Sequence, residues 1–165
     1  MIHNPEIVLF DEPTTGLDPV MIDFVDEMVR RTQQRFGITS VIVSHDTHSV
    51  LGLADSISML RDGQIGWEGT ADEVRGSSDE QISLFFEGAH EELSTAAGAG
   101  EVEEHKDLET VVELSGVEKG FGAQEVLRGV NLTVKRDEIT VIIGAFPIDR
   151  ASREARFGQK FADLR

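Results

Sequence analysis

The first 76 residues alternate between short apolar runs and one long amphipathic segment. Ile7–Phe10 is continuously apolar, the pattern of a strand buried on both faces of a parallel sheet. Apolar positions then recur at helical spacing from Val20 to Phe36, and Gly37 is placed to end that helix. The β-branched run 38–43 follows, so strand, helix and strand predict a βαβ unit. This pattern predicts an α/β fold with a mainly parallel sheet.

A hairpin and a short helix are predicted after this unit. Two apolar runs, 57–60 and 65–68, flank an Asp62-Gly63 pair, which favours a tight turn between antiparallel strands. Thr70 followed three residues later by Glu73 is typical of a capped helix start.

The composition changes between Asp79 and Glu109, where ten carboxylates face a single basic residue, Lys106. The small residues 94–100 lie inside this stretch, so residues 90–109 are predicted to form an acidic flexible linker. Three β-rich runs follow, at 111–114, 126–134 and 139–143. We therefore expect a small antiparallel β module over residues 110–144 and an irregular tail over 145–165.

Charge and cysteine content exclude several classes of protein. The 165 residues carry 15 Lys and Arg against 31 Asp and Glu, a formal net charge of −16, which argues against nucleic acid or an anionic lipid surface as a direct partner. The chain has no Cys, which removes disulfides, thiolate zinc sites and thiol catalysis. No apolar run approaches the ~18 residues that a spanning helix requires, so we expect a cytoplasmic chain without direct membrane insertion.

The strongest chemical signal is the pair Asp11-Glu12, which the apolar strand 7–10 delivers at its carboxyl end. An isolated acidic pair in such a place is usually just solvated. In nucleotide hydrolysis, however, an Asp there can hold Mg²⁺ and the next Glu can act as general base. The string from Leu9 to Pro19 resembles the Walker B motif and D-loop of ATP-binding-cassette (ABC) ATPases. This resemblance implies a P-loop NTPase core, with Asp11 at Mg²⁺, Glu12 as catalytic base and Asp18 in the D-loop at the nucleotide.

His45 is the second candidate residue. A single His beside a strand is more often a packing or solvent-capping residue. The run Ile42-Val43-Ser44-His45-Asp46, one βαβ unit after Glu12, resembles the switch-histidine segment of ABC ATPases. The resemblance implies that His45 contacts the γ-phosphate and supports the attacking water.

The hairpin over residues 60–70 is similar to the segment after the switch histidine in ABC transporter subunits. DNA-repair and chromosome-maintenance ABC ATPases generally lack it, so the resemblance favours transport. Residues 14–19 and 84–88 point to the Mla-like branch, which handles phospholipids or solvents. The implied partners are a transmembrane permease subunit and another ABC ATPase subunit, and the implied place is the inner face of the cell membrane.

The resemblance divides the chain into parts of two domains. Residues 1–89 resemble the C-terminal half of one ABC ATPase domain, so a Walker A loop, a Q-loop and a signature motif would have had to precede Met1. Residues 110–144 resemble the opening strands of another such domain, in which Phe121 matches the aromatic residue that stacks on adenine. A core position between strands is the alternative interpretation of Phe121.

The resemblance ends at Gly144-Ala145-Phe146-Pro147. A phosphate loop needs consecutive glycines, a Lys and a Ser or Thr, and none of these follows Gly144. We therefore expect the isolated chain to be a truncated and catalytically incompetent ATPase, although the family implies ATP and Mg²⁺. The alternative is a non-enzymatic remnant or a regulatory protein that docks a transporter.

One structural hypothesis joins the two ends of the chain. In the ABC core, the strand before the phosphate loop lies beside the strand before the switch histidine. The run 139–143 is therefore expected to pair with 41–43, which a linker of roughly 20 residues is long enough to allow.

Overall fold

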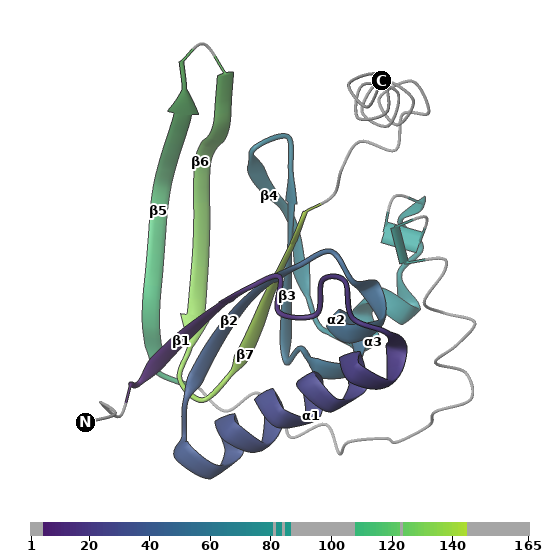
Figure 1. Ribbon diagram of the computed structural model, residues 1–165. Helices are drawn as coiled ribbons and strands as arrows, with labels where there is room; N and C mark the ends of the chain where they lie inside the picture. The colour runs from purple at the N-terminus through teal and green to yellow at the C-terminus, as the bar shows by residue number, and fades with distance from the viewer. Residues whose placement is uncertain (1–4, 81, 84, 87–107, 123, 145–165) are drawn as a thin grey trace, which may run out of the picture.

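Two sheets carry the fold in the computed structural model, which describes residues 5–80, 82–83, 85–86, 108–122 and 124–144. The larger sheet has five strands in the order β1-β2-β7-β3-β4, and the smaller has two, β5-β6 (Figure 1). Helices accompany them. The predicted linker over 90–109 lies outside the described residues except for its last two positions, and the predicted tail over 145–165 lies wholly outside them.

The five-stranded sheet is mainly parallel. β1 (Ile7–Asp11), β2 (Thr39–Ser44), β7 (Ile139–Gly144) and β3 (Ser56–Arg61) run in one direction. β4 (Gln64–Gly69) returns antiparallel to β3 and forms the predicted hairpin. The fold class expected from the sequence, α/β with a mainly parallel sheet and a small antiparallel module, is therefore confirmed.

Two predicted helix signals are confirmed, Gly37 at the end of one helix and Thr70 with Glu73 at the start of another, whereas the caps at Asp18 and Asp46 were not predicted. α1 (Pro19–Phe36) is capped by Asp18, and it ends at Gly37, whose φ of 58° is left-handed. α2 (Thr47–Leu53) follows β2, and α3 (Ala71–Gly76) opens with the expected capping box. Among the described residues, no helix combines the length and the apolarity that crossing a bilayer requires.

β7 joins the two ends of the chain into one sheet. It lies between β2 and β3, with Val41 in register with Thr140 and Ile57 with Val141. The backbone N–H of Ser40 donates to the carbonyl oxygen of Glu138 at 2.9 Å, which continues the β2–β7 ladder. The hypothesis that the run 139–143 docks beside 41–43 is therefore confirmed.

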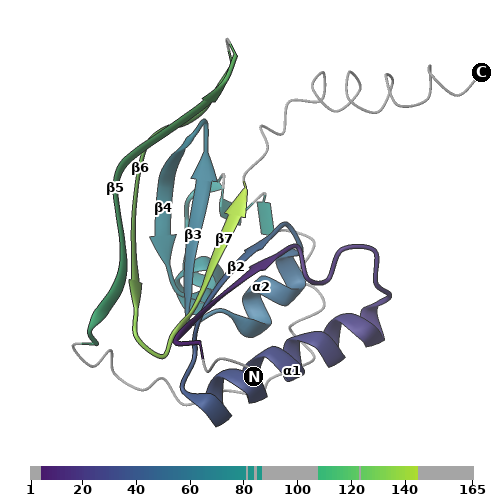
Figure 2. The same ribbon diagram turned by 60° about the vertical axis from the view of Figure 1, so that its left-hand side comes forward.

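The main hydrophobic core lies between this sheet and the helices, on the face that Figure 2 shows covered by α1 and α2. It draws on both ends of the chain, because side chains of β7 interleave with those of β2, β3 and the segment after α3. Its most deeply buried members are Ile57, Phe86, Ile139, Ile143, Val50, Val74 and Val141.

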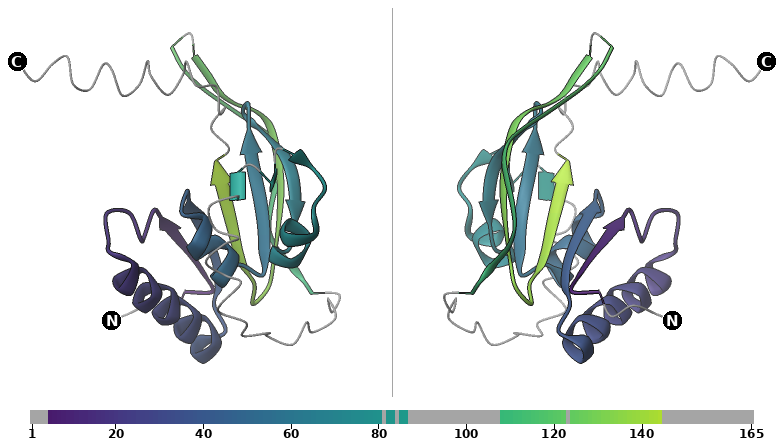
Figure 3. Two further views of the ribbon diagram at one scale, coloured as in Figure 1. Left: turned by 90° about the vertical axis from the view of Figure 1, so that its right-hand side faces the viewer. Right: turned by 90° about the vertical axis from the view of Figure 1, so that its left-hand side faces the viewer.

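The second sheet is a long hairpin of β5 (Thr110–Phe121) and β6 (Gln124–Lys135) that lies over the other face of the main sheet (Figure 3). At its base, side chains of Leu132 and Val134 pack against Val41. β6 also contacts the β3–β4 turn, where the backbone N–H of Arg128 donates to the carbonyl oxygen of Gly63 at 2.7 Å. A Cβ at residue 63 would lie 2.8 Å from a carbonyl oxygen of β6, so this approach requires glycine.

One partly buried carboxylate lies where α1 meets α2. Asp26 accepts a hydrogen bond from the Ser49 hydroxyl at 2.7 Å. Burial raises the pKa of the Asp26 carboxyl above its ordinary value, and the Ser49 hydrogen bond only partly offsets this. The folded chain therefore binds this proton more tightly than the unfolded chain, so the charged form of Asp26 costs stability above its folded-state pKa.

We predict that Asp26→Asn raises the melting temperature at pH 7 by about 1–2 °C, because an amide keeps the acceptor for Ser49 without the buried charge. The gain should shrink as the pH falls toward the folded-state pKa of Asp26. Thermal melts at pH 4 to 8 test this, with Glu113→Gln at an exposed position of β5 as control. A gain equal at all pH values would contradict the assignment to this carboxylate.

Candidate functional site

The carboxyl ends of β1 and β2 bring two of the predicted residues together. Glu12 directly follows β1 and His45 directly follows β2, and these strands are hydrogen-bonded neighbours. The His45 Nδ1 atom lies 2.7 Å from Glu12 Oε2. Residues 33 positions apart thus form a direct carboxylate–imidazole contact, which the sequence spacing alone could only imply.

Backbone and side-chain contacts fix the position of Glu12. Its N–H donates to the carbonyl oxygen of Val43 at 2.8 Å, and its φ of 50° places it in the left-handed region. That conformation is uncommon for a residue other than glycine and is typical of positions held by surrounding structure. The Thr15 hydroxyl donates to Glu12 Oε2 at 2.9 Å. Sequence reasoning missed Thr15, although a hydroxyl three residues after Glu12 was a signal for such a turn.

Asp11 and Asp18 lie at either end of the turn that carries Glu12. Asp11 is the last residue of β1 and is exposed. The Asp18 carboxylate accepts from the backbone N–H groups of Val20 and Met21 at 3.1 and 3.2 Å, so it caps α1. Asp18 thus has a structural role as the N-cap of α1. Its role at a nucleotide stays a prediction, as does the role of Asp11 at Mg²⁺.

Phe121 lies apart from this pair, at the far end of the β5–β6 hairpin (Figure 1). It is 67% exposed, so the alternative of a core aromatic is wrong. The Lys119 ammonium lies 5.2 Å from the centroid of its ring. The Phe121 side chain is therefore largely exposed, with Lys119 over its ring, and the structure does not bring it to Glu12 and His45.

The end of β7 lies beside the end of β2, with Ile143 in register with Ser44. Gly144, in register with Leu60 of β3, therefore ends β7 at the same end of the sheet as His45. The residues from 145 on lie outside the described part of the chain, and the three that directly follow Gly144, Ala-Phe-Pro, include neither glycine nor Lys. Among the described residues, this end of the sheet brings together Glu12 and His45.

Across the described ranges, no group of three or more His, Asp or Glu side chains is arranged to hold a metal ion.

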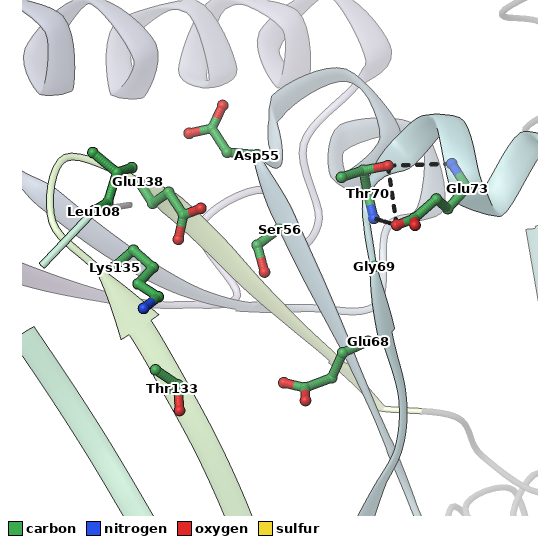
Figure 4. Close-up of a pocket in the computed structure, with 10 residues that line it drawn as sticks. All are labelled: Asp55, Ser56, Glu68, Gly69, Thr70, Glu73, Leu108, Thr133, Lys135 and Glu138. Atoms are coloured by element: carbon green, nitrogen blue, oxygen red, sulfur yellow. Dashed lines mark hydrogen bonds between the residues drawn. The ribbon is translucent and has the colours of Figure 1, made fainter. Parts of the chain in front are cut away.

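A cavity of about 580 Å³ lies at the other end of the parallel strands from Glu12 and His45. It lies between the starts of β3 and β7, the end of β4 and the base of the β5–β6 hairpin (Figure 4). Its lining is acidic, but the carboxylates have structural partners. Asp55 accepts from the backbone N–H of Ile139 at 2.8 Å, and Glu73 belongs to the capping box of α3. Glu68 accepts from the Ser58 hydroxyl at 3.0 Å. Of these contacts, the one between Asp55 and Ile139 joins the two parts of the chain.

Comparison with known proteins gives partial matches. No protein-family model matches the chain. The intermembrane phospholipid transport system ATP-binding protein MlaF of Haemophilus influenzae is 33% identical over 85 residues, which is 52% of this chain and 32% of that protein. The Fe(3+) ions import ATP-binding protein FbpC of Rhizobium etli is 28% identical over 142 residues, or 86% of this chain and 39% of that protein.

A further match, the uncharacterized ABC transporter ATP-binding protein YcbN of Bacillus subtilis, is 32% identical over 84 residues, with 51% of this chain and 27% of that protein covered. The chain thus spans about a third of the length of the curated relatives it matches. The resemblance to ATP-binding proteins of ABC transporters, including the Mla-like one, is confirmed over the matched residues.

Proposed function

We propose that this chain is part of the ATP-binding subunit of an ABC transporter and contributes the water-activating side of its nucleotide site. The observation that carries the proposal is the 2.7 Å contact between Glu12 Oε2 and His45 Nδ1 at the ends of two adjacent parallel strands. Ligands of α/β sheets bind at this edge. The similarity to ATP-binding proteins of ABC transporters supports the same assignment.

In this proposal the roles are divided among five residues. Glu12 accepts a proton from the attacking water, and His45 orients Glu12 and reaches the terminal phosphate. Asp11 holds Mg²⁺, whose charge offsets that of the phosphates. Asp18 keeps the turn after Glu12 fixed to α1 and borders the nucleotide, and Phe121 offers its exposed ring to adenine.

The transport role is proposed from the relatives. MlaF is named as part of a phospholipid transport system, which supports lipid or hydrophobic solutes as cargo. FbpC is named for iron import, so the chain is also similar to a protein whose named cargo is different. We propose that ATP binding and hydrolysis drive transport through a membrane permease subunit, with a second ATPase subunit beside this one at the inner face of the membrane.

The lone chain is expected to hydrolyse ATP at the background rate, because the Lys and glycines that would stabilise the phosphoryl group do not follow Gly144. Glu12→Gln should then leave phosphate release unchanged. Release of phosphate from ATP with Mg²⁺ measures this, with Glu27→Gln on the exposed side of α1 as control. Turnover that Glu12→Gln abolishes would show that this prediction is wrong.

Binding of a fluorescent ATP analogue tests the proposal itself. Weak saturable binding is expected, with a Kd near or above 1 mM. This corresponds to a binding free energy of about −4 kcal/mol or one that is less negative. Phe121→Ala should weaken it several-fold, whereas Val126→Ala, another exposed apolar residue of the hairpin, should not. An absence of saturable binding would instead favour the alternative, a non-enzymatic protein that docks a transporter. The sequence after Gly144 is the observation that supports this alternative.

A further inference from the structure

Each of the two paired site residues is followed by a helix. Glu12 leads through a turn into α1, and His45 leads into α2, which begins at Thr47. The paired side chains are themselves accessible, 34% exposed for Glu12 and 56% for His45. Exposed pairs of this kind contribute little stability and do not by themselves fix two side chains. The order of the pair therefore depends on the contacts of the elements that carry it.

A buried hydrogen bond joins α1 to α2 close to His45. Ser49, in the first turn of α2, is 5% exposed, and its hydroxyl donates to Asp26 Oδ1 of α1 at 2.7 Å. The Ser49 backbone N–H donates to Asp46 Oδ1 at 3.2 Å. Asp46 is the N-cap of α2 and directly follows His45. A change at Asp26 or Ser49 therefore reaches His45 through one capped helical turn.

The turn after Glu12 closes these contacts into a circuit. Glu12 Oε2 accepts from the Thr15 hydroxyl at 2.9 Å, and Asp18 caps α1, the helix that also carries Asp26. We call this closed set of contacts the α1–α2 circuit; its members, in order, are Glu12, Thr15, Asp18, Asp26, Ser49, Asp46 and His45. Linked hydrogen bonds of this kind position their members more firmly than separate ones.

The contact with Glu12 also decides which nitrogen of His45 carries the hydrogen. An ionised carboxylate only accepts hydrogen bonds, so His45 Nδ1, 2.7 Å from Glu12 Oε2, is the donor. In the neutral ring the hydrogen is then on Nδ1, and Nε2 is the nitrogen left for a ligand. The tautomer of His45 therefore reports whether the pair is in place.

We propose that Asp26 and Ser49 are positioning residues of this site. Their hydrogen bond holds α2 against α1, so that His45 stays on Glu12 as the Nδ1–H tautomer. The inference rests on the proposed function, which gives His45 a role at the phosphate. It adds two residues that act on His45 through Asp46.

Long-range ¹⁵N–¹H correlation spectra of the full chain, recorded where the ring is neutral, measure the tautomer of His45. The signals of His45 are those that disappear in His45→Gln. We expect Nδ1–H to be the major tautomer in the wild type. In Ser49→Ala the ratio of Nδ1–H to Nε2–H should fall by about 2- to 10-fold, the effect of losing one ordinary hydrogen bond. Asp26→Ala should act in the same way.

Three further variants separate positioning from stability. Asp26→Asn should keep the wild-type ratio, because its amide oxygen still accepts from Ser49. Thr47→Ala removes a hydroxyl from the same turn of α2 that is not part of the circuit, and it is the matched control. Val74→Ala destabilises the main core away from the circuit, and it should also keep the ratio.

An unchanged ratio in both Ser49→Ala and Asp26→Ala would overturn the inference and leave the proposed function standing. A fall of the same size in Thr47→Ala or Val74→Ala would also overturn it, because the ratio would then follow the stability of the helix or the core. A wild type without an excess of Nδ1–H would show that His45 does not contact Glu12 in solution. The proposed function would then lose the contact that carries it, together with this inference.

Discussion

Ile143→Ala is expected to lower the free energy of unfolding by about 2–5 kcal/mol. Ile143 is fully buried in β7, in register with Ser44 of β2 and Met59 of β3. Its side chain fills the core that α1, α2 and the segment after α3 also share. Domains of this size have a total stability of roughly 5–15 kcal/mol, so the loss is a large part of it.

The fluorescence of Trp67, which lies in the first half of the chain, reports this loss of stability. Trp67 is the only tryptophan and lies in β4, partly buried against the main core. In urea unfolding followed by Trp67 fluorescence, Ile143→Ala should move the midpoint to lower urea. Val126→Ala, at an exposed position of the hairpin, should leave the free energy of unfolding within about 0.5 kcal/mol of the wild type. An unchanged Trp67 transition in Ile143→Ala would mean that β7 does not belong to this sheet.

Phe86→Ala is expected to cost about 3–5 kcal/mol. Phe86 is fully buried in the main core, with its ring centroid 5.2 Å from that of Phe85 in an edge-to-face arrangement. The prediction tests the proposed extent of the first unit, residues 1–89, because it requires the chain to stay packed nearly to that boundary.

Thermal melts followed by circular dichroism measure the effect of Phe86→Ala. Phe36→Ala removes the same side chain from a half-exposed position at the end of α1, and it is the matched control. Loss of stability in the control alone, with Phe86→Ala near the wild type, would exclude the segment after α3 from the core.

Local signals in the sequence were sufficient for most of the secondary structure. Gly37 ends α1 because only glycine adopts its left-handed conformation at little cost. The Asp62-Gly63 pair turns the β3–β4 hairpin for the same reason, with positive φ at both residues. These features depend on neighbours in sequence, which is why patterns alone could predict them.

Contacts between distant residues were harder to predict. The pairing of β7 with β2 could be inferred only from the family resemblance, since parallel pairing leaves no local mark, and its pairing with β3 was not predicted. The contact of β6 with Gly63 and the partial burial of Asp26 depend on packing and were not predicted. At the site, the residues Glu12 and His45 could be named in advance, but their direct contact and the hydrogen bond from Thr15 required the fold.

Cutting the chain between its two parts tests the central claim that both ends form one core. A specific protease site placed between Ala97 and Gly98, in the proposed linker, would allow this in the full-length protein. The account predicts that the two fragments co-elute in size-exclusion chromatography and keep the native Trp67 fluorescence, because β7 is held on both sides by β2 and β3. Fragments that separate without denaturant would contradict the single composite sheet and the site built on it.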